Sequence, residues 1–274
     1  MAASLIVGLF GGLIGSFLNV VVYRVPRGLS VVNPPSACPT CGMQITARDN
    51  VPVLSWLLLR GRCRGCSSSI SARYPLVEAG TALFFAAVAL RFLPDLLSSV
   101  GTAEVVAIAV AGVAFLWLAG ASVALALIDL DVHRLPNAIV FPLYAVGAVL
   151  LTTSSVLTGD GPALIRAGVG FAVLGGVYLL LALAVPGGMG GGDVKLAGAL
   201  GLYLAWLGWP SLAVGAISAF IAGGLFGLIL IVTRRAKRGT SVPFGPWMLA
   251  GAWLGIFAGA PIASAYLQVI GLGV

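Results

Sequence analysis

Residues 105–131 read VVAIAVAGVAFLWLAGASVALALIDLD, an apolar run that ends in two aspartates. The part from Val105 to Leu127 carries no charge, and it exceeds the roughly 20 residues that a helix needs to cross a bilayer. A carboxylate at the edge of hydrocarbon costs about 3 kcal/mol unless it is paired or used. The stretch therefore predicts a membrane helix with a candidate functional residue, Asp129, at its end.

The composition extends this prediction to the whole chain. Of its 274 residues, 60% are hydrophobic and 8% are charged, with a mean hydropathy of +1.10, whereas soluble domains carry about 25% charged residues. We therefore expect an all-α polytopic membrane protein. The net charge of +7 comes from basic residues in short loops between apolar segments. It indicates membrane orientation and contact with lipids, not binding to nucleic acid.

About eight apolar segments are candidate transmembrane helices. The sixth is the shortest, and the turn-forming sequence Leu207-Gly208-Trp209-Pro210 supports its end. The first has no basic residues before it and no clear cleavage site, so we expect a retained helix rather than a signal peptide. The expected spans are Ser4–Tyr23, Pro75–Leu93, Val105–Leu127, Ala138–Leu157, Ala163–Val185, Leu196–Leu207, Leu212–Thr233 and Phe244–Leu267.

The distribution of basic residues predicts the orientation. With the N-terminus outside, only Arg91 and Arg166 of the 15 Lys and Arg residues lie on the outer side. Because basic residues concentrate in cytoplasmic loops, we expect both termini outside and both Asp129 and Asp193 at the cytoplasmic face. The expected domains are a first transmembrane helix (1–23), a cytoplasmic module (24–74) and a seven-helix transmembrane domain (75–274).

All four cysteines lie in the expected module. Cys38-Pro-Thr-Cys41 and Cys63-Arg-Gly-Cys66 are two C-x-x-C pairs, and two such pairs typically complete a tetrahedral zinc site of four thiolates. Such a closed site is structural and does not identify a reaction. A redox-active dithiol is the main alternative, although a reducing cytoplasm disfavours disulfides.

A second candidate acid, Asp193, closes the sequence Gly187-Gly188-Met189-Gly190-Gly191-Gly192. Because each glycine disfavours a helix by about 1 kcal/mol relative to alanine, we expect irregular backbone here, lining a cavity or buried in protein. In the alternative interpretation, Asp193 caps the helix that follows a plain loop. The residues expected to form a substrate-approach loop are Gly190, Gly191, Gly192 and Lys195.

As a pair, Asp129 and Asp193 predict aspartyl proteolysis. Two carboxylates in one site do not both ionise cheaply, so one activates a water molecule and the other polarises the scissile carbonyl. Asp131 is expected to be solvated or to support the site, although an exchange of roles with Asp129 stays open. Other hydrolytic sites lack materials, because His133 is the single histidine and neither H-E-x-x-H nor G-x-S-x-G occurs.

Six motifs, in order, resemble a known family. Together they are similar to the bacterial type IV prepilin peptidases (leader peptidase/N-methyltransferases), which are G-x-G-D intramembrane aspartyl proteases. The resemblance spans nearly the whole chain. Its motifs are Gly15–Pro26 (GSFLNVVVYRVP), the two cysteine pairs, Ile70–Glu78 (ISARYPLVE), Asp129 with Pro136 seven positions on, Gly190–Leu196 (GGGDVKL) and Val242–Pro246 (VPFGP).

The resemblance implies cleavage of type IV prepilins, or of type II secretion pseudopilins, after a glycine at the cytoplasmic face of the bacterial inner membrane. It implies that Asp129 and Asp193 are catalytic, and the spacing to Pro136 favours Asp129 over Asp131. It further implies methylation of the new N-terminal amine with S-adenosylmethionine. Glu78 is a site candidate, and a partnership with Arg73 at the membrane surface is an equal alternative.

Two other functions use the same residues. A proton- or cation-coupled transporter would have a natural use for two aspartates beside a glycine-broken helix, but it leaves the four cysteines unexplained. A non-catalytic assembly platform would dock partners through the cysteine segment, which is the expected module of residues 24–74.

Overall fold

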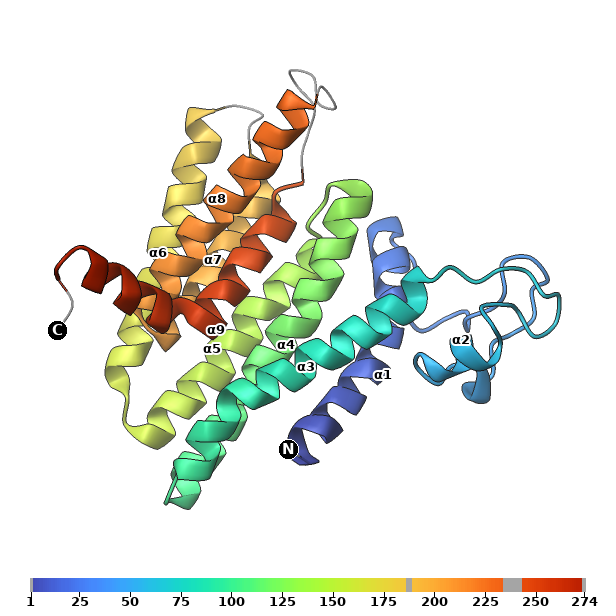
Figure 1. The fold of residues 1–274 in the computed structure, drawn as a ribbon, viewed down its shortest axis with the longest axis horizontal. Coiled ribbons are helices and arrows are strands. Elements are labelled where there is room, and N and C mark those ends of the chain that lie inside the picture. The colour runs from blue at the N-terminus through green and yellow to red at the C-terminus, as the bar shows by residue number, and fades with distance from the viewer. Residues whose placement is uncertain (1, 186–188, 234–242, 273–274) are drawn as a thin grey trace. The chain divides into compact units, whose positions relative to one another are not determined.

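The protein is an assembly of helices in this computed structural model, which describes residues 2–185, 189–233 and 243–272 (Figure 1). The described residues contain no β-strand beyond two isolated bridges. This confirms the prediction of an all-α fold. The long helices are α1 (Ala2–Arg24), α3 (Arg73–Ser98), α4 (Thr102–Val132), α5 (Asn137–Thr158), α6 (Gly161–Ala184), α7 (Gly191–Leu207), α8 (Trp209–Val232) and α9 (Gly245–Val269).

Each expected span coincides with one of these long helices. Within the described residues, seven helices are long and apolar enough to cross a membrane, so the chain is a multi-pass membrane protein. The exception is α7, which has 17 residues. Most of these helices are longer than the expected spans, because the helical backbone extends past the last apolar residues, which marked the expected ends.

The described chain divides into two compact units. Unit 1 comprises Met1–Ser98 and Phe115–Ala124, and unit 2 comprises Ser99–Ala114 and Leu125–Val274. The middle of α4 therefore belongs to unit 1 and its two ends belong to unit 2. Both candidate aspartates fall in unit 2, whereas the four cysteines fall in unit 1.

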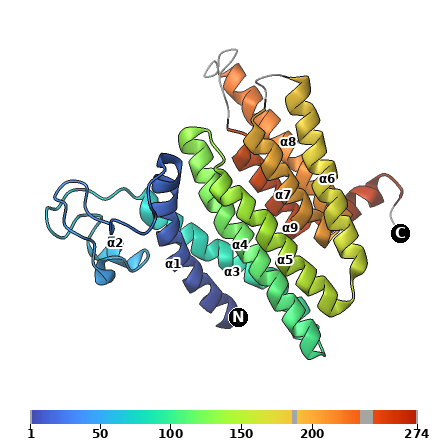
Figure 2. The ribbon, with the colours of Figure 1, turned by 180° about the vertical axis from the view of Figure 1, so that it is seen from behind.

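In unit 1, α1 and α3 lie side by side in both views (Figures 1 and 2). Glycines on α1 permit this approach: an ideal Cβ on Gly11 would lie 2.6 Å from Phe85 Cβ, and one on Gly15 would lie 2.8 Å from Glu78 Cα. Close contact of this kind is the main source of helix association in lipid. Between the two helices the chain forms a loop-rich segment with η1 (Val25–Arg27), η2 (Ala47–Asp49) and α2 (Leu54–Leu58).

In unit 2, α7 is buried on all sides by α5, α6, α8 and α9. Its backbone meets that of α6 directly, because an ideal Cβ on Gly201 would lie 2.2 Å from Gly170 O. A similar contact joins α8 to α9, where a Cβ on Gly255 would lie 2.3 Å from Ser211 O. The apolar residues of α7 therefore serve protein packing, and this packing fixes the helix that carries Asp193.

Several sequence expectations concern residues outside the described ranges. They are Gly187 and Gly188 of the glycine run, Val242 of the VPFGP motif, and the basic residues Arg234, Arg235, Lys237 and Arg238.

Candidate functional site

Asp129 lies in the last turn of α4 and is 5% exposed. Its Oδ2 accepts a hydrogen bond of 3.0 Å from the backbone N–H of Gly245, the first residue of α9. A charge-assisted bond of this kind fixes the orientation of a buried carboxyl. The N-terminus of α9 thus holds the carboxyl at the end of α4.

Asp193 lies in the first turn of α7 and is half-buried. Its Oδ2 accepts a hydrogen bond of 2.9 Å from the Gly190 N–H, and its own N–H donates to Gly190 O at 3.0 Å. This is the capping geometry of the alternative interpretation, and it leaves Oδ1 for other partners. Like Asp129, Asp193 therefore has one oxygen held by a backbone N–H.

Leu135 lies where the supports of the two carboxyls meet. An ideal Cβ on Gly192, next to Asp193, would lie 3.1 Å from Leu135 Cβ. A Cβ on Gly245, the donor to Asp129, would lie 3.1 Å from Leu135 Cδ2. The fold therefore brings together two acids that lie 64 positions apart (193 − 129).

Aromatic packing supports the start of α9. The Phe244 ring, directly before Gly245, lies with its centroid 6.2 Å from that of Tyr178 and 5.7 Å from that of Phe220. These rings come from α6 and α8, so three helices determine where the Gly245 N–H points. Sequence reasoning missed this role; its signal was the VPFGP motif, to which the resemblance attached no chemistry.

The expected substrate-approach loop differs from what the structure contains. Gly191, Gly192 and Lys195 belong to α7, and only Gly190 has extended backbone. Glycine is tolerated at this helix start because the first-turn N–H groups have no intrahelical partners and Asp193 caps one end. Lys195 Nζ donates to Asn137 Oδ1 at 3.1 Å.

The ionisable neighbours of Asp129, Asp131 and His133, are exposed. Asp131 lies about half a helical turn further along α4 than Asp129. His133 ends the helix in the left-handed conformation, with a φ of 53°. The His133 N–H donates to the carbonyl of Asp129 at 2.9 Å. Asp129 is thus the buried carboxyl of this segment, whereas Asp131 is exposed.

The four cysteines form one cluster. Their sulfurs all lie within 4.8 Å of one another, with 3.8 Å between Cys38 and Cys66 and 4.0 Å between Cys41 and Cys63. In a tetrahedral site with Zn–S bonds of about 2.3 Å, the sulfurs lie roughly 3.8 Å apart. The donor set and its spacing therefore fit a zinc ion, which confirms a metal-binding arrangement after the first helix.

The thiols of this cluster differ in acidity. The pKa of Cys38 is lowered to about 5, first by a hydrogen bond from the Cys41 backbone, and that of Cys66 is lowered by the Ser68 hydroxyl. At Cys41 a hydrogen bond from the Met43 backbone lowers the pKa, but desolvation and the neighbouring thiols outweigh it and raise the pKa to about 11. A bound dication would favour four thiolates at this spacing.

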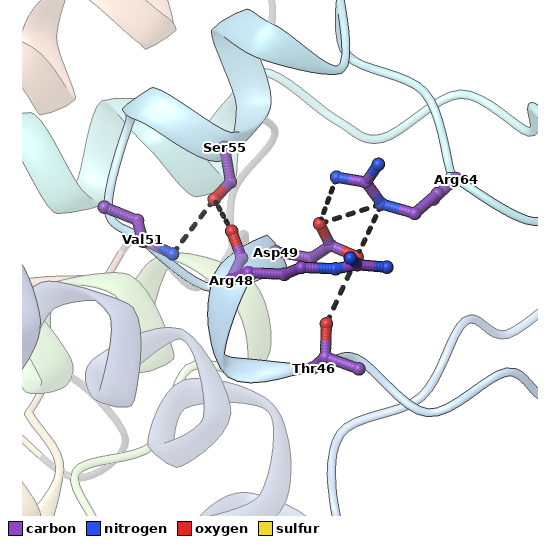
Figure 3. A network of polar contacts seen from close by, with 6 residues as sticks. All are labelled: Thr46, Arg48, Asp49, Val51, Ser55 and Arg64. Atoms are coloured by element: carbon purple, nitrogen blue, oxygen red, sulfur yellow. Dashed lines mark hydrogen bonds and ion pairs between the residues drawn. The ribbon is translucent and has the colours of Figure 1, made fainter.

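Polar contacts hold the cysteine segment together (Figure 3). Arg64, between the cysteines of the second pair, binds Asp49 through Nε at 2.9 Å and Nη2 at 2.6 Å, which lowers the pKa of that carboxyl. Ser55 Oγ accepts from the Val51 N–H and donates to Arg48 O, both at 3.0 Å. The network joins η2 and α2 to the second cysteine pair.

Two family models match the chain, one over the region of the cysteines and one over the region of the two aspartates. Residues 9–92, which include the cysteines, match the bacterial peptidase A24 N-terminal domain. Residues 114–232, which include both aspartates, match the type IV leader peptidase family. No solved structure matches the chain significantly.

Curated relatives match nearly the whole chain. A prepilin leader peptidase/N-methyltransferase of Aeromonas salmonicida is 38% identical over 97% of this chain and 94% of its own. Proteins of the same name from Pseudomonas aeruginosa and Burkholderia pseudomallei are 34% and 32% identical, over 96% and 95% of this chain and 93% and 86% of their own. These matches give no support to a transporter. The chain belongs to the type IV leader peptidase family.

Proposed function

We propose that this protein is a membrane aspartyl endopeptidase that cleaves the leader of type IV prepilins or pseudopilins after a glycine, and then methylates the new N-terminus. The observation that carries the proposal is the position of Leu135, which lies against Gly192, next to Asp193, and against Gly245, the donor to Asp129. Relatives with 34–38% identity carry both activities in their name, which supports the same substrate class here.

The two carboxyls divide the work of peptide hydrolysis. The ionised carboxyl takes a proton from a water molecule, and the protonated one donates a hydrogen bond to the scissile carbonyl oxygen. The water oxygen bonds to the carbonyl carbon, the C–N bond after the glycine breaks, and the leaving amine takes a proton from the carboxyl pair. Backbone N–H groups hold Oδ2 of each aspartate, so Oδ1 of each serves the water and the peptide.

The site is proposed to face the cytoplasm from the bacterial inner membrane. Both aspartates lie at helix ends, and basic residues follow each of them closely, Arg134 after Asp129 and Lys195 after Asp193. Basic residues flanking membrane helices favour the cytoplasmic side. A prepilin whose apolar segment lies in the bilayer would present its polar leader at this depth.

Zinc is the metal proposed for the cluster of Cys38, Cys41, Cys63 and Cys66. All four ligands are protein thiols, so no coordination position is open to substrate, and the ion stabilises the fold of its segment. S-adenosylmethionine is the proposed methyl donor, and it supplies an electrophilic methyl group when bound. We assign none of the described residues to it, and no step of the cleavage depends on it.

The decisive experiment measures prepilin cleavage by purified protein in detergent. Asp129→Asn and Asp193→Asn should each lower the rate by at least about 10³-fold, because an amide can neither accept nor share the proton. Asparagine can still accept from the Gly245 or Gly190 N–H, so the fold should persist.

Asp160→Asn is the matched control. Asp160 caps α6 by accepting a hydrogen bond of 3.0 Å from the Ala163 N–H, so the change alters an aspartate at another helix start and should leave the rate unchanged. Full cleavage by both the Asp129 and the Asp193 variants would rule out the aspartyl mechanism, and wild-type protein that leaves the prepilin uncut would rule out the endopeptidase function.

A further inference from the structure

The cysteine segment meets the membrane helices at a polar junction in unit 1. We call Ser16, Asn19, Asn50, Val53 and Glu78 the junction; they come from α1, from the loop before α2 and from α3. The sequence left two interpretations of Glu78 open, as a site residue or as a partner of Arg73. In the structure its carboxylate bonds to the cysteine segment.

Glu78 Oε2 accepts a hydrogen bond of 2.7 Å from the backbone N–H of Val53, 25 residues earlier. Val53 has a φ of 61°, a conformation that β-branched residues adopt only under strain. Strained backbone persists where the surroundings hold it in place. The Glu78 carboxylate supplies that hold, because it binds the N–H of the strained residue.

Residues of the opening GSFLN sequence complete the junction from α1. Ser16 Oγ donates to Asn50 Oδ1 at 3.3 Å, and Asn19 Nδ2 donates to Tyr74 O at 3.3 Å. Gly15 admits Glu78 to this place, because a Cβ there would lie 2.8 Å from Glu78 Cα. The junction thus joins both helices of the α1–α3 pair to the loop that leads into α2.

We propose that Glu78 is a positioning residue that fixes the cysteine segment against α1 and α3 through the Val53 N–H, and that methyl transfer, but not leader cleavage, depends on this anchor. The inference rests on the proposed function. Both cleavage carboxyls come from α4 and α7 in unit 2, so loss of the anchor leaves their supports in place. Because both cleavage carboxyls lie outside the cysteine segment, we place the second activity in that segment.

The test compares Glu78→Ala and Glu78→Gln in full-length protein, with trypsin as the probe of anchoring. Arg48, Arg60 and Arg62 of the segment are exposed. In Glu78→Ala, tryptic cleavage there should be at least about fivefold faster, because the Val53 N–H loses its acceptor. The methylated fraction of cleaved prepilin should fall by about the same factor, with the leader cleavage rate within about twofold of wild type. Glu78→Gln should behave as wild type, because its amide oxygen can accept the same hydrogen bond.

Glu104→Ala is the matched control. Glu104 Oε2 accepts a hydrogen bond of 3.2 Å from the Val100 N–H near the start of α4, so the variant removes the same kind of bond elsewhere. It should leave trypsin sensitivity and methylation unchanged.

Three results would overturn the anchor. If Glu78→Ala were digested by trypsin and methylated its product as the wild type does, Glu78 would not anchor the cysteine segment. Equal defects in the glutamine and alanine variants would mean that the charge matters and the hydrogen bond does not. Equal losses of cleavage and methylation would exclude a selective role. The Asp129 and Asp193 variants test the proposed function separately, since they leave the junction intact.

Discussion

The backbone N–H of Gly245 donates to Oδ2 of Asp129 at 3.0 Å, across 116 residues of chain. An ideal Cβ on Gly245 would lie 2.7 Å from that same oxygen and 3.1 Å from Leu135 Cδ2. The close approach that makes the hydrogen bond therefore leaves no space for a side chain. Glycine is needed here for contact with the carboxyl, and the start of α9 is part of the candidate site.

Gly245→Ala should lower the rate of prepilin cleavage by at least about 100-fold, because a displacement near 1 Å of a reacting group costs that much. The measurement is the initial rate in detergent, with the thermal midpoint taken to check folding. Gly227→Ala is the control, since a Cβ at Gly227 meets nothing within 4 Å and the rate should be unchanged. A Gly245→Ala enzyme within threefold of wild type would show that Asp129 does not need this contact.

Lys195 is expected to act on α7 itself, not on the substrate. Its Nζ binds Asn137 and lies 5.5 Å from the centre of the Phe141 ring, and the Tyr144 hydroxyl donates to its carbonyl. Lys195→Ala should therefore lower kcat about three- to tenfold with little change in KM, because a lost ion–dipole contact and cation–π pair are worth about 1 kcal/mol.

Steady-state kinetics on a prepilin distinguish support of α7 by Lys195 from the direct contact with substrate that the sequence predicts. Lys195→Arg keeps the charge near Asn137 and Phe141, and should retain most of the activity. A raised KM at unchanged kcat in Lys195→Ala would place the side chain on the substrate instead.

The sequence was informative about the helices because membrane spans leave a long, uninterrupted pattern. The segment from Val105 to Leu127 carries the apolar signal of α4, and Asp129 follows within the same helix. Two glycines of the run, Gly191 and Gly192, lie in a helix for a physical reason. The cost of glycine applies to helix interiors, whereas Gly191 and Gly192 occupy a first turn that Asp193 caps.

The supports of the carboxyls could not be predicted in the same way. Gly245 acts on Asp129, and Val53 on Glu78, through backbone N–H groups that every residue but proline possesses. Such donors leave no mark in residue type, and their partners lie 116 and 25 positions away. Only the fold identifies them. The cysteines differ, because their side chains are the ligands and their C-x-x-C spacing can be recognised in the sequence itself.

The cysteine cluster should bind one zinc ion per chain. Elemental analysis of reduced, freshly purified protein measures the metal directly. Cys38→Ser combined with Cys63→Ser removes the two buried thiols, and should abolish the metal because too few thiolates remain. Thr40→Ala, between the ligands of the first pair, should keep it. Metal-free wild-type protein would contradict the closed site.

The contact between α6 and α7 should determine the stability of the helix that carries Asp193. An ideal Cβ on Gly201 would lie 2.2 Å from Gly170 O, and one on Gly170 would lie 2.5 Å from Gly201 O. Because these neighbours are backbone atoms, they can move only if the helices separate. Gly201→Ala should therefore cost about 1–3 kcal/mol of stability, as overpacking of a tight core does.

Thermal unfolding in detergent, followed by tryptophan fluorescence, measures that loss as a lowered midpoint, and leader cleavage should fall with it. Gly168 and Gly176 of α6 provide matched controls, because a Cβ at either meets nothing within 4 Å. Alanine at these two positions should leave the midpoint unchanged or raise it slightly, since it favours the helix. If Gly201→Ala unfolds at the wild-type temperature, α7 tolerates displacement from α6, and its packing does not fix the position of Asp193.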